Sequence, residues 1–495
     1  MPSPPPCGSR GGASRAAALL VLAVGLLGCG VGEEAGPDAG PLDPLGLHDW
    51  ASAVVHQSGE RWVGERLADR EPDARPPTAV RLESELAPIA IHAAGDVGEA
   101  TVASALRGVE AMHALLLQEG WPEAIMDGGR GGTVGFDVYL VDDVMSRAGF
   151  DQRSLFSYLD RGSSFARAPS WLPSADTEVC AATAYAEARL LSLDPAEAES
   201  WRRATAAYLA QRLTGRWGCE DEALENQAQP FEAYVPYADE VPTAGGALLL
   251  AALSQRHEST AGEFVASLWD LASQRTWEGT GYRGSPDLWE ALETVLRVSD
   301  DPTAAAIETV ALDRFLAGTR RTPSSPAWVA QLGPNAAPPA LLTLSTSHLS
   351  THPPSTGELD PPIEIEPTGT FYALVHVGEA APQSRLRVFL RGEFGVAWSL
   401  AVARLASDGR ELGRMSAPSR RGTPHSYLPV ELGDDTVWVA IAVTNLGREA
   451  RESRHFPVPN VDGTRSDARA ARIMLELVSD EPAPAGATPE AAPPG

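Results

Sequence analysis

The sequence predicts an α+β protein in which a helix-dominated domain with a small sheet, residues 47–318, precedes a β-sandwich, residues 368–480. Three observations support this fold class. Apolar residues recur at helical spacing in the first region, whereas from Gly369 onward they alternate with a period of two. A Pro- and Ser/Thr-rich stretch, residues 319–367, separates the two patterns and is expected to be a linker with a few strand-like fragments. With 495 residues, the chain is long enough for two or three domains.

The first 28 residues have the pattern of an export signal. Arg10 and Arg15 form a positive n-region, and the apolar run that follows them is shorter than the roughly 20 residues that a membrane span needs. Leu26-Leu27-Gly28-Cys29 matches a bacterial lipobox. We therefore expect a lipoprotein signal peptide over residues 1–28, acylation of Cys29, and export to the bacterial cell envelope. Gly30 rather than Asp follows the Cys, which favours the outer over the inner membrane. The alternative is an ordinary signal peptide with a chance Cys.

Both ends of the mature chain are expected to be disordered. Residues 29–46 are rich in Gly, Pro and acidic residues and are typical of a tether between the lipid and the first domain, and residues 481–495 have a similar composition. The formal charge of −27 repels nucleic-acid phosphates, so the expected partner is the membrane and no nucleic-acid partner is expected. All 39 basic residues are Arg, which excludes a phosphate-loop lysine, a Schiff-base lysine and a Ser–Lys dyad.

The first domain begins with a strand and a helix. LAPIAIHAAG, residues 86–95, predicts a strand, and Asp96 with Glu99 three positions later predicts a capping box for a helix through about Glu119. The apolar face of this helix is formed by Met112, Leu115 and Leu116. A Gly-rich loop then leads into a second strand, Phe136–Val141.

The loop itself, Asp127–Gly132 (DGGRGG), is similar in composition to calcium and phosphate loops. Calcium repeats need tandem copies to share their ligands, and this chain has one copy. We interpret the loop as a tight turn that feeds the strand.

Two helices, residues 181–193 and 195–213, are predicted on either side of Asp194-Pro195. Asp194 is the expected N-cap of the second helix, with Pro195 at its first position and Glu197 completing a capping box. Further helices are expected to begin near Thr243, near Thr260 with Glu263 as box partner, at Ser285-Pro286 and at Asp301-Pro302. Core candidates at helical spacing in the second helix are Trp201, Thr205, Tyr208 and Leu209.

Five segments of the C-terminal region read as strands without an intervening helix, as in a β-sandwich. Ser407-Asp408-Gly409 is a hairpin signal between two of them. The segments are YALVHV, RLRVFLR, VAWSLAVARLA, TVWVAIAVTN and ARIMLELV.

Two cysteines remain for the folded mature chain, because Cys7 leaves with the signal and Cys29 takes the lipid. These are Cys180, at the start of the first helix of the pair, and Cys219, just past the second. A helical hairpin would bring them together, and in an oxidising compartment two cysteines are a natural pair. Closing this loop would contribute roughly 4 kcal/mol on the chain-entropy model. Two buried free thiols are the alternative.

The histidines do not form a helix-borne zinc site. There are ten, and none lies between His113 and His257. Such a site needs two His at i and i+4, so that both imidazoles project from one helix face. His348 and His352 have this spacing, but they lie in the Ser/Thr-rich linker and no Glu follows the first. We interpret them as a solvated loop pair.

Four pieces in order nevertheless resemble a family, the secreted bacterial metalloproteases of the gluzincin type found in myxobacteria-like genomes. They are GWPEA with DGGRGG, the strand FDVYLVDD, the helix pair 181–213, and GGALLLAALSQRHESTAGEFVASLWDLASQ. The resemblance covers about residues 85–300. It implies a strand followed by a helix with His-Glu-x-x-His, a second helix with a Glu as third zinc ligand, and often a C-terminal β-sandwich.

This sequence departs from the family at the ligand positions. If Glu187 stands at the general base, Ala186 and Leu190 stand at the two His positions. If the frame moves by one residue, Tyr185 and Arg189 stand there. Glu187 is therefore a vestigial candidate for the catalytic residue.

On the second helix, Arg203 falls about where the ligand Glu would be, and an Arg repels a dication. Zinc needs three protein ligands to polarise water, so no metal and no cofactor are expected. The alternative reading of Glu187 is an ordinary surface or salt-bridged Glu that pairs with Arg203 or Arg189. The resemblance then implies a pseudoenzyme that lacks peptidase activity.

Three functions stay open. The first is a cell-envelope lipoprotein whose inactive metallopeptidase-like domain serves binding or structure. The second is an active hydrolase with an unrecognised carboxylate-based site. Here the sequence pairs no two acids, and Glu220-Asp221-Glu222 reads as an exposed loop rather than a cation site. The third is a carbohydrate- or adhesion-binding protein that acts through the sandwich. Tyr372, Trp398 and Trp438 would then form a stacking face, although we favour core positions for them.

Overall fold

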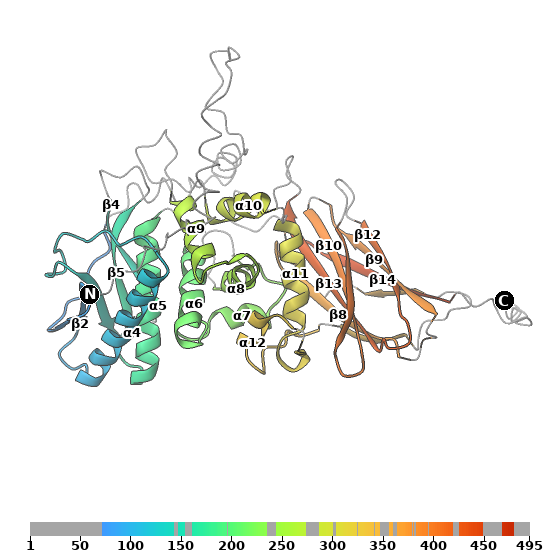
Figure 1. Ribbon diagram of the computed structural model, residues 1–495, viewed down its shortest axis with the longest axis horizontal. Helices are drawn as coiled ribbons and strands as arrows, with labels where there is room; N and C mark the ends of the chain where they lie inside the picture. The colour runs from blue at the N-terminus through green and yellow to red at the C-terminus, as the bar shows by residue number, and fades with distance from the viewer. Residues whose placement is uncertain are drawn as a thin grey trace, which may run out of the picture. The chain divides into compact units, whose positions relative to one another are not determined.

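The computed structural model of the chain is shown in Figure 1. The segments predicted as signal peptide (1–28) and tether (29–46, with Cys29), the pair His348 and His352, and the predicted tail 481–495 lie outside the described residues. The structure describes residues 72–142, 147–153, 161–195, 197–234, 244–273, 287–299, 303–323, 325–340, 342–346, 356–359, 364–378, 380, 383–394, 396–418, 425–448 and 468–479.

The first region is built on a five-stranded sheet with the order β1-β2-β3-β5-β4. β2, β3 and β5 are parallel, and the edge strands β1 and β4 are antiparallel to their neighbours. The two helices α4 and α5 pack on one face, where alternate strand residues such as Ile91 and Val138 enter their common core. The elements are β1 (Val80–Glu83), β2 (Ile89–Ala93), α4 (Glu99–Gln118), β3 (Phe136–Val141), β4 (Arg147–Arg153), β5 (Gly162–Pro169) and α5 (Ser174–Leu193). The predicted strands at 86–95 and Phe136–Val141 are confirmed.

The capping box at Asp96 is wrong. α4 begins at Glu99 with Gly98 as N-cap and no side-chain cap, so Glu99 is the first helical residue instead of the third. A box requires its Glu at the third position, so local spacing alone misplaced the helix start. The same error occurs at Thr260, since Glu263 is the first residue of α9 and Gly262 is its N-cap.

The helix pair differs from expectation at both starts. α5 begins at Ser174, seven residues earlier than predicted, and α6 (Glu199–Thr214) begins four residues later. Asp194 is the C-cap of α5, not the N-cap of α6, whose N-cap is Ala198. The residue before a proline is driven out of the α region, and Asp194 accordingly has φ −146° and ψ 91°. Pro195 therefore ends α5 rather than starting α6.

The remaining helices form one core with α5 and α6, in which Trp201 and Trp289 meet edge to face at 4.9 Å. α10 has a complete capping box made by Asp287 and Glu290, two residues past the predicted Ser285-Pro286 start. α12 and all but the first residue of the 3-10 turn lie within the stretch predicted as a linker. The elements are α7 (Ala223–Ala228), α8 (Gly246–His257), α9 (Glu263–Ala272), α10 (Leu288–Val298), α11 (Thr303–Phe315), η2 (Gly318–Arg320) and α12 (Ala327–Gln331).

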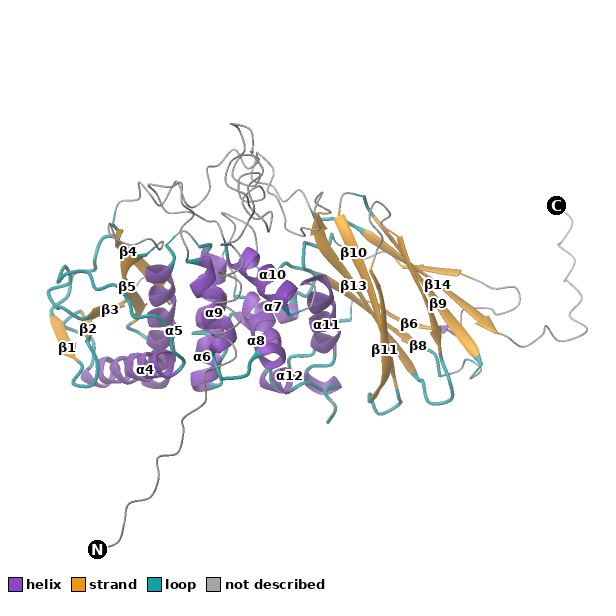
Figure 2. Cartoon of the chain, turned by 45° about the horizontal axis from the view of Figure 1, so that its top comes forward, coloured by secondary structure: helices purple, strands orange, loops and turns teal. Residues whose placement is uncertain are grey.

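The C-terminal region consists of two sheets that pack face to face (Figure 2). The orders are β11-β10-β13-β8-β6 and β12-β9-β14-β7, and side chains such as Trp398 and Val388 fill the space between them. β6 and β7 come from the stretch predicted as a linker. The strands are β6 (Leu342–Ser345), β7 (Thr356–Leu359), β8 (Thr370–His376), β9 (Ser384–Gly392), β10 (Val396–Leu405), β11 (Glu411–Pro418), β12 (His425–Glu431), β13 (Trp438–Arg448) and β14 (Ala471–Ser479).

α11 lies against the outer face of the five-stranded sheet of this region. Leu312 and Phe315 form a small core with Ala401 and Ala442 there, and the Tyr372 hydroxyl donates to the carbonyl of Ala311 at 2.6 Å. The two sheets thus differ, because a helix covers the outer face of one of them. Within the described residues, no helix is long and apolar enough to cross a membrane.

Candidate functional site

Glu187 is a buried residue of α5, with 4% of its surface exposed. The backbone N–H of Ala148 on edge strand β4 donates to its carboxylate. Burial raises the pKa of Glu187 to about 7, although the nearby charges of Arg203 and Arg202 on α6 lower it. Glu187 is therefore not a surface residue as one reading held.

The two arginines considered as partners of Glu187 have different roles. Arg189 donates to the Tyr185 hydroxyl at 2.8 Å and to the carbonyl of Pro122 at 2.5 Å, so the suggested pairing of Glu187 with Arg189 is wrong. Arg203 forms an ion pair of 2.9 Å with Glu199, one turn earlier on α6, and contributes the largest cationic effect on Glu187. The cluster at the α5–α6 junction is thus a set of carboxylates balanced by guanidinium groups.

The positions next to Glu187 point into apolar surroundings. Ala186 and Leu190 line the space between α4 and α6 together with Leu116, Trp121 and Leu209. In the shifted frame, Tyr185 is buried and its hydroxyl lies 2.8 Å from Nδ1 of His113. Neither frame directs two side chains with metal-binding atoms from one face of α5 toward Glu187.

These residues do not fit the zinc ion that the gluzincin resemblance implies. Ala and Leu offer no donor atom, and Arg203 brings a positive charge to the place of the third ligand. Among the described residues, no group of three His, Cys, Asp or Glu side chains is arranged to hold a metal ion. We derive no chemistry through a metal at Glu187.

The disulfide between Cys180 and Cys219 is confirmed. Cys180 lies in α5, and Cys219 lies in the turn after α6, with Cα atoms 4.3 Å apart. Arg216 fixes this turn by donating to the carbonyl of Cys219 at 2.8 Å and to Asp176 at 2.6 Å. The bond joins the second turn of α5 to the turn that follows α6.

Two further carboxylates meet at the N-terminus of α10, a pairing that the sequence did not indicate. Glu197 accepts from the backbone N–H groups of Ala198 at 2.8 Å and Leu288 at 2.7 Å, and Asp287 accepts from Glu290 N at 2.8 Å. Burial raises the pKa of Glu197 to about 7, and burial together with the charge of Glu197 raises that of Asp287. Because their oxygens bind backbone N–H groups, this pair caps α10 and holds it against the α5–α6 turn.

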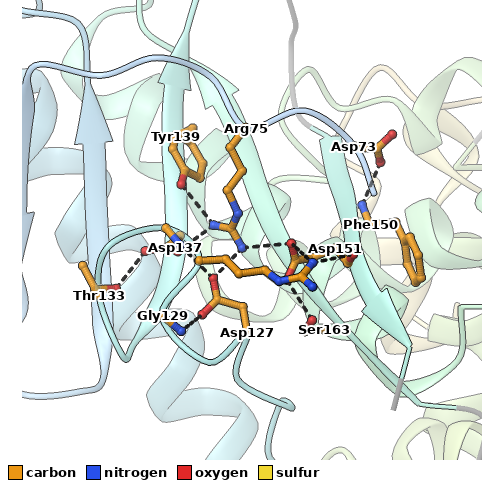
Figure 3. Close-up of polar contacts among 12 residues, drawn as sticks. Asp73, Arg75, Asp127, Gly129, Thr133, Asp137, Tyr139, Phe150, Asp151 and Ser163 are labelled. Atoms are coloured by element: carbon orange, nitrogen blue, oxygen red, sulfur yellow. Dashed lines mark hydrogen bonds and ion pairs between the residues drawn. The ribbon is translucent and has the colours of Figure 1, made fainter. Parts of the chain in front are cut away.

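A third polar cluster lies on the sheet face opposite α4 and α5, and Figure 3 shows its members. The guanidinium group of Arg75 is surrounded by Asp137 at 2.6 Å, Asp127 at 2.5 Å and Asp151 at 3.4 Å, and donates to the Tyr139 hydroxyl at 3.0 Å. The three Asp side chains are 1–4% exposed. The guanidinium group of Arg75 thus occupies the centre of the three carboxylates.

The cluster explains the Gly-rich loop. Asp127 accepts from the backbone of Gly129 at 2.7 Å and Gly131 at 3.1 Å, and Gly128, Gly129 and Gly132 have φ between +73° and +91°. A Cβ on Gly131 would lie 1.7 Å from Oδ2 of Asp137. The loop is a tight turn that closes over the cluster.

His92 extends the cluster along the sheet. Its Nε2 lies 2.8 Å from Oδ1 of Asp137, and its ring stacks on Tyr139 at 4.7 Å. Although burial opposes it, hydrogen bonds from His92 and Thr133 lower the pKa of Asp137. Sequence reasoning missed this site because only Asp127 lay in a motif.

The remaining candidates are structural. In the acidic loop, Asp221 accepts from Trp217 N at 2.8 Å, while burial raises the pKa of Glu222. In the sandwich, Tyr372 and Trp398 are completely buried and Trp438 is partly buried. The suggested stacking face of these three aromatic residues is therefore wrong, and the core reading holds for Tyr372 and Trp398.

No protein-family model matches this sequence, and no curated protein matches it. The solved structures similar to parts of it include tailspike protein 4 of bacteriophage CBA120 (TM-score 0.17, 6% identity, 27% of this chain and 20% of that one). They also include the pre-peptidase C-terminal domain of a Bacillus anthracis collagenase (TM-score 0.15, 9% identity, 28% and 96%). A third is the pair of CBM22-1 and GH10 modules of the endo-1,4-beta-D-xylanase 10B of Clostridium thermocellum (TM-score 0.16, 9% identity, 26% and 25%). The chain thus spans about a fifth of the tailspike and a quarter of the xylanase.

Proposed function

We propose that this protein is a lipid-anchored, exported protein of the bacterial cell envelope that binds a ligand and does not hydrolyse peptides. In this proposal its helix-dominated domain is a degenerate metallopeptidase framework of the gluzincin type, and its two-sheet domain presents the binding surface. The lipobox at Cys29 is the basis for the anchor.

The order of elements supports the ancestry. The strand of the resemblance, β3, precedes α5 in the chain with β4 and β5 between them, and α5 is followed by α6, which packs against it. A strand, a helix and a second helix thus occur in the sequence order that the resemblance implies. Fold ancestry alone does not assign an activity, so the proposal depends on the residues at the site.

The main support for the proposed loss of peptidase activity is the environment of Glu187. A general base of a metalloprotease acts on a metal-bound water and needs access to it. Glu187 is buried against Ala148 and the arginines of α6, and Ala186 and Leu190 are packed among apolar side chains. The residues at this position therefore offer no set of ligands for a metal that would activate water.

A peptidase assay of the purified full chain tests the proposal. With a broad mixture of unstructured peptides as substrate, we expect the same background hydrolysis from the wild type, from Glu187→Gln and from the wild type treated with a chelator. Hydrolysis by the wild type that both the chelator and Glu187→Gln abolish would refute the proposal.

A further inference from the structure

The outer face of the four-stranded sheet β12-β9-β14-β7 carries a row of apolar side chains that cross strands. Tyr427 lies opposite Phe389, and Phe389 lies opposite Met474. Tyr427 is 43% exposed, Phe389 and Met474 are partly exposed, and the Tyr427 and Phe389 rings are 4.8 Å apart. Neighbouring strands are separated by about 4.8 Å, so the three side chains cover roughly 10 Å, a length suited to two sugar rings.

A row of basic residues borders these side chains on one side. His425 lies opposite Arg391, and Arg391 lies opposite Arg472, all three exposed. Within the described part of the chain, Arg391 makes no ion pair with a carboxylate. Phe394, which is 72% exposed, has its ring 6.5 Å from that of His425.

The arginines on the other side of the apolar row are neutralised within the sheet. Arg387 pairs with Glu476 at 3.0 Å, and Arg385 pairs with Glu431 at 2.5 Å. Among the arginines of β9, Arg391 is thus the one that keeps its positive charge for a ligand within the described residues. In a chain with a formal charge of −27, such a residue marks the place where an anionic ligand is favoured.

We infer that this face binds an acidic polysaccharide, in which sugar rings stack on Tyr427 and Phe389 while a uronate carboxylate binds Arg391. Aromatic faces provide stacking surfaces, and a guanidinium group binds a carboxylate through two parallel hydrogen bonds. Within the described residues, α11 covers the outer face of the other sheet and not this one. The inference rests on the proposed binding function, for which it names the ligand class.

Isothermal titration of the purified full chain with galacturonic-acid oligosaccharides tests this inference. A matched probe is the same oligosaccharide with its carboxylates converted to methyl esters. We expect the acid form to bind, with an affinity that falls as salt is added, and the ester to bind about tenfold more weakly. Tyr427→Ala and Arg391→Ala should each weaken binding of the acid about tenfold, while Tyr427→Phe keeps it.

Arg385→Ala is the matched control, because Arg385 is on the same strand as Arg391 but pairs with Glu431. It should bind like the wild type, and all variants should keep the wild-type melting temperature. The inference is overturned if no oligosaccharide binds at millimolar concentration, if only anionic lipid vesicles bind, or if Arg385→Ala and Arg391→Ala lose affinity equally. A negative titration does not change the result expected from the peptidase assay, so the two experiments test the two proposals independently.

Discussion

Arg75 donates to Asp137 across 62 residues of sequence at 2.6 Å, and the same guanidinium group pairs with Asp127 and Asp151. The segment before β1, which contains Arg75, is thereby attached to the face of the sheet opposite α4 and α5. Arg75 is thus shared by three carboxylates that are almost completely buried, and Arg130 also pairs with Asp151 at 3.4 Å.

Arg75→Ala should therefore destabilise the protein strongly. Removal of the cation leaves three buried carboxylates without their shared partner, and breaking a buried charge network in this way costs about 3–5 kcal/mol. Chemical denaturation of the variant and the wild type measures the loss. Arg107→Ala is the control, because Arg107 and Glu178 form an exposed pair at 3.2 Å, for which about 1 kcal/mol or less is expected. Equal, small losses for both variants would contradict the role of Arg75.

Replacement of both Cys180 and Cys219 by Ala should lower the free energy of unfolding by about 2–5 kcal/mol. The bond closes a loop of sequence separation 39 and restricts the unfolded chain. Denaturant titration checks this loss, and a reducing agent added to the wild type should reproduce most of it. The prediction is contradicted if the reductant leaves the denaturation midpoint of the wild type unchanged while the double variant is destabilised. In that case the loss of stability would come from replacing the cysteine side chains and not from losing the bond.

Stability should fall as pH rises from 5 to 8. Burial raises the pKa of Glu187 and of Glu197 from 4.5 to about 7, so the folded state holds these protons more tightly than the unfolded state. Their contribution is complete below pH 4.5 and is lost as pH rises through about 7.

Glu187→Gln, which mimics the protonated form, should reduce the fall in melting temperature between pH 5 and pH 8. Part of the fall should persist, because Glu197 is unchanged. Glu178→Gln on the exposed surface of the same helix should leave the pH profile as in the wild type. A profile that Glu187→Gln leaves unaltered would show that this carboxyl group does not titrate in the window.

Cys29→Ala should release the protein from the membrane or leave its signal peptide uncleaved. The predicted lipobox, Leu26-Leu27-Gly28-Cys29, would require the thiol of Cys29 for acylation. Radiolabelled palmitate should enter the wild type and Cys7→Ala but not Cys29→Ala. Recovery of the wild type as a soluble protein with an unmodified Cys29 would contradict the anchor.

Patterns of apolar residues predicted the elements that lie in the core. The strand Phe136–Val141 and the end of α5 at Leu193 follow from periodicity and from Pro195. Helix starts were less predictable, because a capping pattern such as Asp96 with Glu99 is weak and local. Tertiary contacts decide where a capping residue binds. Glu197 was expected to cap α6, but it accepts a hydrogen bond from the backbone of Leu288 at the N-terminus of α10, which lies 91 residues further along the chain.

The polar sites depend on contacts that no local pattern encodes. Arg75 reaches its partners across 52, 62 and 76 residues, and only Asp127 stood in a recognisable motif. In the sandwich, period two distinguishes the faces of a strand but does not say which aromatic residues remain exposed. Tyr372 faces α11 and is buried, whereas Tyr427 has no described helix over it and is exposed.

The zinc content of the purified mature chain tests the central claim most directly. After equilibrium dialysis against micromolar zinc and removal of free metal, we expect far less than one zinc per chain by mass spectrometry of the metal, with the same value for Glu187→Gln. The expectation follows from Ala186, Leu190 and Arg203 at the three ligand positions. One tightly bound zinc per chain, accompanied by peptide hydrolysis that is lost in Glu187→Gln, would contradict the account and indicate a metalloprotease with unusual ligands.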